Sequence, residues 1–132
     1  MHIETSKKIV SKSDKEIFEF LTDIKNFKTL MPENIEKFEV LDENTFKFAL
    51  KGMPEIVLRL KEEHPNEKVV LGAASDKLPF TLTADIKAID DSQSEVGLRF
   101  EGEFNAMMAM MIKGPITNFM GTLSNNMDKI GQ

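Results

Sequence analysis

Apolar residues along this chain follow two different periods, and the change of period divides the chain into regions. From Phe38 to Phe104 they alternate with polar residues, which places them on one side of extended strands. Nearer both ends they recur every three or four residues, which is the spacing of one face of an α-helix. The pattern therefore predicts helices early in the chain, a series of strands in the middle and a helix at the end.

The N-terminal region predicts one strand followed by two short helices. Residues 2–10 carry β-compatible side chains with a mixed alternation. Ser13-Asp14-Lys15-Glu16 then fits a capping box, in which the first residue caps a helix and the fourth bonds back to the cap. An apolar helical stripe follows as far as Ile24, and a second short helix ends at Pro32, because the residue before a proline is pushed out of the α region.

The middle of the chain predicts six further strands. In residues 80–87, for example, four apolar residues alternate with threonine, aspartate and lysine. Turn residues separate the segments at Asp42–Asn44, Gly52–Pro54, His64–Glu67, Ser75–Lys77 and Asp90–Ser92. Alternation with one charged face is typical of an antiparallel sheet that has one apolar side. With the N-terminal strand, the prediction is a seven-stranded antiparallel meander.

The last part of the chain predicts one long helix. Asn105 fits the N-cap position, and apolar residues recur at the helical spacing from Ala106 to Ile130. Such a helix would be roughly 37 Å long. Pro115 lacks a backbone N–H, so we expect a kink or a break at Gly114-Pro115. A helix of this length can cover the apolar side of a curled sheet, with the two short helices closing one end.

This order of elements resembles the helix-grip fold of the START-like superfamily, also called SRPBCC, which includes pollen-allergen-like carriers and polyketide cyclases. The local match runs from Ser13 to Asp23 and continues through Asn26-Phe27 to Leu30-Met31-Pro32, while residues 107–130 resemble the family's cavity-covering helix. The resemblance covers the whole chain. It implies an α+β helix-grip fold, in which a seven-stranded curved antiparallel sheet wraps around a long C-terminal helix and two short helices follow the first strand. It also implies a hydrophobic cavity between the sheet and that helix.

Composition narrows the classes of protein that fit. The 132 residues are 41% hydrophobic and 30% charged, which suits a single globular domain, residues 1–132. The net charge is −5 and only two of the seventeen basic residues are arginine, which argues against nucleic-acid binding. The start of the chain has no apolar run and no segment is long enough to span a bilayer, so we expect a cytoplasmic location without stable membrane insertion.

The polar residues indicate no catalytic set. The chain has no cysteine, and His2 and His64 lie too far apart for a local zinc motif, so we expect no metal site. The phosphate-binding and dinucleotide-binding glycine patterns are absent, so we expect no cofactor. His64 lies in a predicted turn, and the charged residues of the strands belong to the solvated face. We therefore predict no catalytic residue.

The apolar residues are the candidate site. The chain has ten phenylalanines, nine methionines, no tryptophan and no tyrosine. Phenylalanine provides rigid apolar walls, and methionine adapts to varied apolar partners. The residues predicted to line the cavity are Phe27, Met31, Phe46, Phe48, Leu58, Leu60, Leu71, Phe80, Leu82, Phe100, Phe104, Met108, Met111, Ile112 and Phe119.

Three functions are consistent with this sequence. The leading hypothesis is binding, transport or sensing of a small hydrophobic ligand, such as a lipid, a quinone or a polyketide-like compound. The second is an enzyme of the polyketide cyclase or dehydratase type, which only the resemblance motivates. The third is a protein with a filled core that forms a homodimer through the exposed part of a cluster comprising Met107, Met108, Met110 and Met111. The first and third differ in whether the space between sheet and helix is open.

Overall fold

The fold is described from a computed structural model, which covers residues 1–33, 35–51, 55–74 and 80–130. In chain order its elements are β1 (His2–Glu4), β2 (Lys8–Val10), α1 (Asp14–Thr22), η1 (Ile24–Asn26), α2 (Phe27–Leu30), β3 (Ile35–Asp42), β4 (Thr45–Leu50), β5 (Ile56–His64), β6 (Lys68–Ala73), β7 (Phe80–Asp90), β8 (Gln93–Gly102), α3 (Ala106–Asn126) and η2 (Met127–Lys129). The turns expected at Gly52–Pro54 and Ser75–Lys77 lie outside the described residues.

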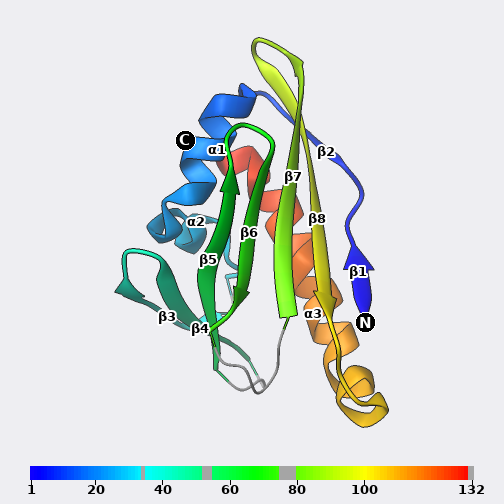
Figure 1. Cartoon of the computed structure of the whole chain (residues 1–132). Helices are drawn as coiled ribbons and strands as arrows, with labels where there is room; N and C mark the ends of the chain where they lie inside the picture. Colours follow the sequence, from blue (N-terminus) through cyan, green and yellow to red (C-terminus); the bar gives the residue numbers. More distant parts are fainter. Residues whose placement is uncertain (34, 52–54, 75–79, 131–132) are drawn as a thin grey trace.

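The strands form one antiparallel sheet in the order β1-β8-β7-β6-β5-β4-β3, and β2 also pairs with β8. From β3 to β8 each strand pairs with the next along the chain, as a meander predicts. Figure 1 shows α3 crossing one face of the curved sheet, while α1 and α2 lie together at one end. The predicted helix-grip α+β arrangement is therefore confirmed.

The first strand differs from its prediction, because it is two short strands on the same neighbour. His2 of β1 pairs with Glu101, whereas Lys8 of β2 pairs with Val96, so the register moves by one residue between them. Thr5 lies between β1 and β2 and is hydrogen-bonded to Leu98 of β8. The Thr5 N–H donates to the Leu98 carbonyl at 3.0 Å, and the Thr5 hydroxyl accepts from the Leu98 N–H at 3.1 Å. The sheet consequently has eight strands rather than seven.

The start of α1 forms as its sequence predicts. The Glu16 N–H donates to the Ser13 hydroxyl at 3.1 Å, and the Ser13 N–H donates to the Glu16 carboxylate at 3.4 Å. This reciprocal pair is the capping box, and it satisfies two backbone donors that a helix otherwise leaves free. It fixes where the helix begins and so directs Ile17 and Leu21 into the core.

The long helix α3 is continuous, so the alternative of a break at Gly114-Pro115 is wrong, whereas the kink stays a prediction. Asn105 caps it, since the Met108 N–H donates to Asn105 Oδ1 at 2.8 Å. Pro115 lies inside the helix and is exposed. Beyond it, Phe119 and Leu123 are buried against the sheet. We attribute the continuity to this packing, because burial of several large side chains outweighs the cost of one interior proline.

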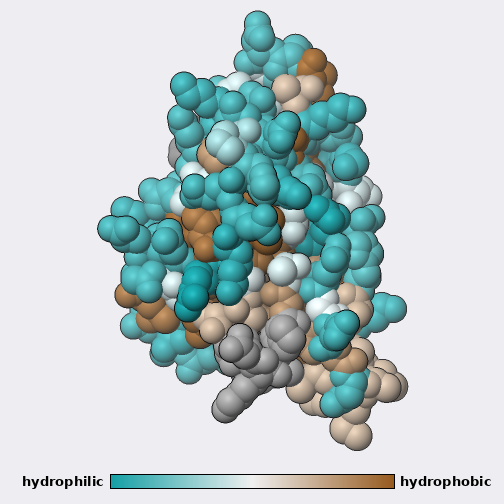
Figure 2. Space-filling model, in the orientation of Figure 1, coloured by the Kyte–Doolittle hydropathy of each residue, from teal (hydrophilic) through white to brown (hydrophobic). Residues whose placement is uncertain are grey.

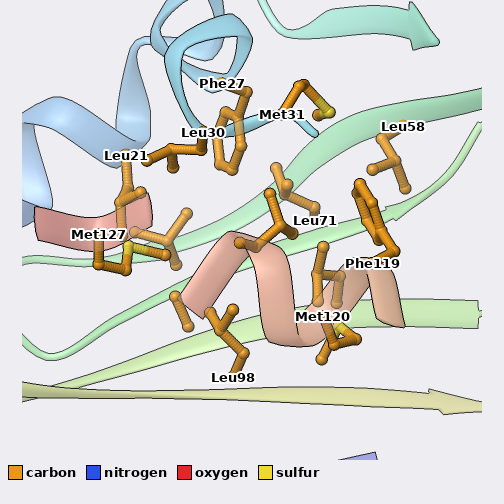
Figure 3. Packing of buried hydrophobic residues seen from close by; sticks show 14 of the residues in the cluster. Leu21, Phe27, Leu30, Met31, Leu58, Leu71, Leu98, Phe119, Met120 and Met127 are labelled. Carbon is orange, nitrogen blue, oxygen red and sulfur yellow. The ribbon is translucent and has the colours of Figure 1, made fainter. Parts of the chain in front are cut away.

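The core lies between the sheet, the C-terminal half of α3 and the two short helices. Figure 3 shows side chains from all three meeting there, among them Phe27 and Leu30 from α2, Leu71 and Leu98 from the sheet, and Met120 from α3. Burial of each such side chain contributes about 1.5–3 kcal/mol. This half of the space between sheet and helix is filled by the chain itself.

Candidate ligand cavity

The other half of that space is hollow. A cavity of about 130 Å³ lies between the sheet and the N-terminal half of α3. The described residues that line it are Phe48, Glu55, Ile56, Leu58, Phe80, Leu82, Phe100, Phe104, Met108, Ile112, Ile116 and Phe119. Only Glu55 among these is charged, and the others are apolar.

Strand pairing and helix periodicity bring the lining residues together. On the sheet, Leu82 pairs with Phe100 and Phe48 pairs with Ile56, so each pair presents two apolar side chains to the same face. On α3, the lining residues follow one another at intervals of four, four and three, which is one stripe of the helix. This stripe lies opposite the apolar side of the sheet.

Aromatic contacts hold the walls of the cavity in place. Phe80 and Phe100 have ring centroids 5.1 Å apart, and Phe100 and Phe104 are 6.2 Å apart with an interplanar angle of 5°. Gly102 makes this arrangement feasible, because a Cβ there would lie 2.6 Å from the Phe104 ring and 2.8 Å from Phe80 Cβ. One tilted and one stacked pair of aromatic rings thus support each other on this wall of the cavity.

Glu55 is half-exposed at the edge of the cavity and belongs to a surface group of four charges. Its carboxylate lies 3.3 Å from Lys47 Nζ and 3.5 Å from Lys37 Nζ, and Glu39 contacts both lysines. The hydrogen bond from Lys47, with the charge of Lys37, lowers the pKa of Glu55 below its usual value. The same contact raises the pKa of Lys47. Glu55 is therefore an ionised carboxylate at neutral pH, already paired with two ammonium groups.

The structure places nine of the fifteen predicted residues around the cavity. They are Phe48, Leu58, Phe80, Leu82, Phe100, Phe104, Met108, Ile112 and Phe119. Their contact with a ligand stays a prediction. Ile56 and Ile116 also line the cavity, although the prediction omitted them. Both continue a pattern visible in the sequence: Ile56 lies two residues before Leu58, and Ile116 lies four residues after Ile112.

Six predicted residues do not line the cavity. Phe27, Met31, Phe46 and Leu71 are buried in the packed core, where Phe27 stacks on Phe46 at 5.3 Å. Leu71 and Phe27 border only a gap of about 10 Å³, which is too small for a ligand. Leu60 packs at the edge of the core, and Met111 is 66% exposed. These residues are excluded because the short helices fill their end of the wedge and because Met111 lies on the solvent side of α3.

The histidines lie away from the cavity lining. His64 Nε2 contacts Glu62 at 3.1 Å and His2 Nε2 contacts Glu4 at 3.0 Å, all four side chains being largely exposed. Among the described residues, no group of three or more histidine, cysteine, aspartate or glutamate side chains is arranged to hold a metal ion. In the same part of the chain, no helix is both long enough and apolar enough to cross a bilayer.

Comparison with known proteins identifies the fold. Norcoclaurine synthase from Thalictrum flavum, solved with dopamine and hydroxybenzaldehyde, has a TM-score of 0.76 at 12% identity over 98% of this chain and 84% of its own. A START superfamily protein from Mycobacterium smegmatis has a TM-score of 0.70 at 10% identity over 97% of this chain and 94% of its own. The chain has the START-like (SRPBCC) fold.

Sequence comparison is less informative for this chain. No protein-family model matches it, and no curated protein is significantly similar in sequence. An uncharacterised protein from Bacillus thuringiensis has a TM-score of 0.64 at 11% identity, over 96% of this chain and 98% of its own. At such identities the likeness concerns the fold alone and assigns no ligand to this chain.

Proposed function

We propose that this START-like protein binds a small apolar molecule in the cavity between its sheet and α3. The proposal is carried by one observation: the cavity of about 130 Å³ is lined by apolar side chains apart from Glu55 at its edge. An apolar cavity of about 150 Å³ stays dry and accepts a guest the size of benzene. Water can form few hydrogen bonds in such a space. An apolar guest that enters it therefore displaces no strongly bound water.

The size of the cavity restricts the ligand class. A single aromatic ring or a short alkyl chain fits the space, and the stacked phenylalanines favour a flat ring. A lipid, a quinone or a polyketide-like compound would place one ring or one chain end inside and extend the rest past the edge at Glu55. Burial of about 150 Å² of apolar surface contributes roughly 4 kcal/mol before the cost of association, so a one-ring guest binds with a dissociation constant of about 1 mM or weaker.

The same residues favour binding, transport or sensing over catalysis. A cyclase-type enzyme needs a side chain that exchanges a proton with the guest. Glu55 is the only titratable group among the described lining residues, and Lys47 and Lys37 hold its pKa below the usual value. Such a carboxylate has no proton to donate at neutral pH and is a weak base. No observation at the cavity favours the enzymatic alternative.

A titration followed by NMR tests the proposal. Toluene and indole added to the methyl-labelled protein are expected to give saturable shifts of the methyl groups of Met108, Ile112 and Leu58. Ile112→Phe fills the cavity from α3 and is expected to weaken toluene binding about tenfold or more. Ile9→Phe is the matched control, because Ile9 is 60% exposed on β2 and should leave binding unchanged.

Two outcomes would count against the proposed function. One is that no single-ring compound gives saturable shifts. The other is that toluene binds equally well to the Ile112→Phe and Ile9→Phe variants, which would place the guest elsewhere. The melting temperature of each variant, measured in the same buffer, shows that it is folded.

A further inference from the structure

Three methionines near the start of α3 face solvent. Met107 is 75% exposed, Met110 is 83% exposed and Met111 is 66% exposed. Figure 2 shows pale brown, mildly hydrophobic atoms at the lower right, where Figure 1 places the start of α3. Their neighbour Met108 is half-buried and lines the cavity, so the three exposed residues occupy a different side of the helix. Their side chains contribute little to the core.

The helix brings these three side chains together. Met110 and Met111 lie three and four residues after Met107 within the continuous helix α3. Residues at these separations are neighbours on a helix surface, with Cβ atoms about 5–6 Å apart. Methionine has three rotatable side-chain bonds, so the three sulfur atoms can converge on one point above the helix. We call these three residues the methionine triad.

Thioether sulfur is a soft ligand that carries no proton, and soft sulfur ligands select Cu(I) among the biological metal ions. We propose that the methionine triad is a binding site for Cu(I), held by three thioether sulfurs on the outer face of α3. The site does not depend on the proposed function, because the triad residues are not among those that line the cavity. It also differs in chemistry from the histidine and cysteine motifs that the sequence lacks.

The surroundings of the triad disfavour other metal ions. Zn²⁺, Ca²⁺ and Mg²⁺ require nitrogen, thiolate or oxygen ligands, and no cluster of such groups occurs in the described residues. Met107 lies in the first turn of α3, where the helix dipole disfavours cations and the penalty grows with ionic charge. A monovalent ion with high affinity for thioethers is therefore the cation that this surface can hold.

Silver nitrate in chloride-free buffer provides the first test, because Ag(I) is also a soft monovalent ion and does not change oxidation state. We expect one Ag(I) per chain and a shift of the methyl resonances of the triad alone among the nine methionines. The affinity should be the same at pH 5.5 and pH 7.5, because thioethers do not titrate. Cu(I), kept reduced by ascorbate under nitrogen, should compete for the same site against the chelator bicinchoninate.

Substitution by leucine removes the sulfur and keeps the apolar bulk. Each of Met107→Leu, Met110→Leu and Met111→Leu should weaken Ag(I) binding about tenfold or more, since even the loss of an outer-shell partner costs a metal site that much. The triple substitution should abolish binding. Met120→Leu is the matched control, because Met120 lies on the same helix but is 1% exposed, and binding should be unchanged.

The proposal is overturned if the triple leucine variant binds Ag(I) as tightly as the wild-type protein. It is also overturned if binding weakens with falling pH and disappears in a His2→Ala/His64→Ala variant, which would assign the ion to imidazole. A stoichiometry of one ion per two chains, together with the mass of a dimer, would also overturn it, because the ion would then be bound between two chains rather than within one. Toluene binding measured on the same samples reports on the cavity separately.

Discussion

Phe48 of β4 and Phe119 of α3 stack with their ring centroids 5.1 Å apart and their planes 15° apart. Phe119 lines the internal cavity on one side and borders a surface cleft with Pro115 and Thr122 on the other. The Phe119 ring therefore separates the cavity from this cleft. It limits the size of guest that the cavity accepts on this side.

Phe119→Ala is expected to enlarge the cavity and change its size preference. Loss of the ring removes the wall, so a two-ring guest such as naphthalene should bind about tenfold more tightly than it does to the wild-type protein. The substitution should also lower the free energy of unfolding by about 3–5 kcal/mol, because a large buried side chain is lost. Urea unfolding measures the stability, and an NMR titration with naphthalene measures the binding.

Phe27→Ala is the matched control for that experiment. Phe27 is also buried and also stacked, on Phe46, but it does not line the cavity. A similar loss of stability with no gain in naphthalene affinity is expected. If both variants gain affinity equally, the gain comes from general loosening of the core, and the role of Phe119 as a wall is wrong.

Ser94 on β8 is fully buried, and within the described part of the chain its hydroxyl has no hydrogen-bond partner. Burial of an unpaired hydroxyl costs free energy, so Ser94→Ala should raise the free energy of unfolding by about 1 kcal/mol. Thr5→Val is the contrasting variant, because it leaves the Leu98 N–H without its acceptor and should lower stability by about 1–2 kcal/mol. Urea denaturation of both variants at neutral pH is the measurement. A loss of stability in Ser94→Ala would show that its hydroxyl is satisfied.

Glu55 should make stability depend on pH in the acidic range. The pKa of Glu55 in the folded protein lies below 4.5, which is its usual value and the value in the unfolded chain. At a pH between the folded and the unfolded pKa, the unfolded chain binds more protons than the folded protein. The free energy of unfolding therefore falls as the pH falls. The contribution is complete at neutral pH and is lost as the pH drops below about 4.5 through the folded pKa. Glu55→Gln should therefore flatten the fall of stability between about pH 5 and pH 3.

The effect is measured as the free energy of unfolding at several pH values, for the wild-type protein, for Glu55→Gln and for the control Glu67→Gln. Glu67→Gln is the control, because Glu67 is exposed in the β5–β6 turn, away from the lysines that contact Glu55. Equal pH dependence of the two variants would mean that the ion pairs of Glu55 are too weakly formed in solution to matter.

Ser13→Ala should lower the free energy of unfolding by about 1 kcal/mol, because the Glu16 N–H loses its acceptor. Ser13→Asp keeps a hydrogen-bond acceptor at the N-cap, so its free energy of unfolding should fall much less than that of Ser13→Ala. Thermal unfolding of the two variants side by side decides this, and equal melting temperatures would show that the cap is dispensable.

The sequence by itself determined the elements that follow the first strand and their order. Alternation defined the strands from β3 to β8, and Ser13 and Asn105 marked where α1 and α3 begin, because these signals act between residues that are close along the chain. The side of each strand that becomes apolar follows from the same alternation. The alternation alone therefore assigns Phe48, Leu82 and Phe100 to the inner face.

Tertiary structure decided which part of the inner face is filled. Phe46 and Phe48 are equivalent in the alternation of β4, yet Phe46 is packed in the core against Phe27 of α2 and Phe48 lines the cavity, because α2 covers only one end of the sheet. The split of the first strand at Thr5 and the continuity of α3 through Pro115 likewise depend on contacts between distant residues. A cavity is space left after all these contacts are made, so no local pattern encodes it.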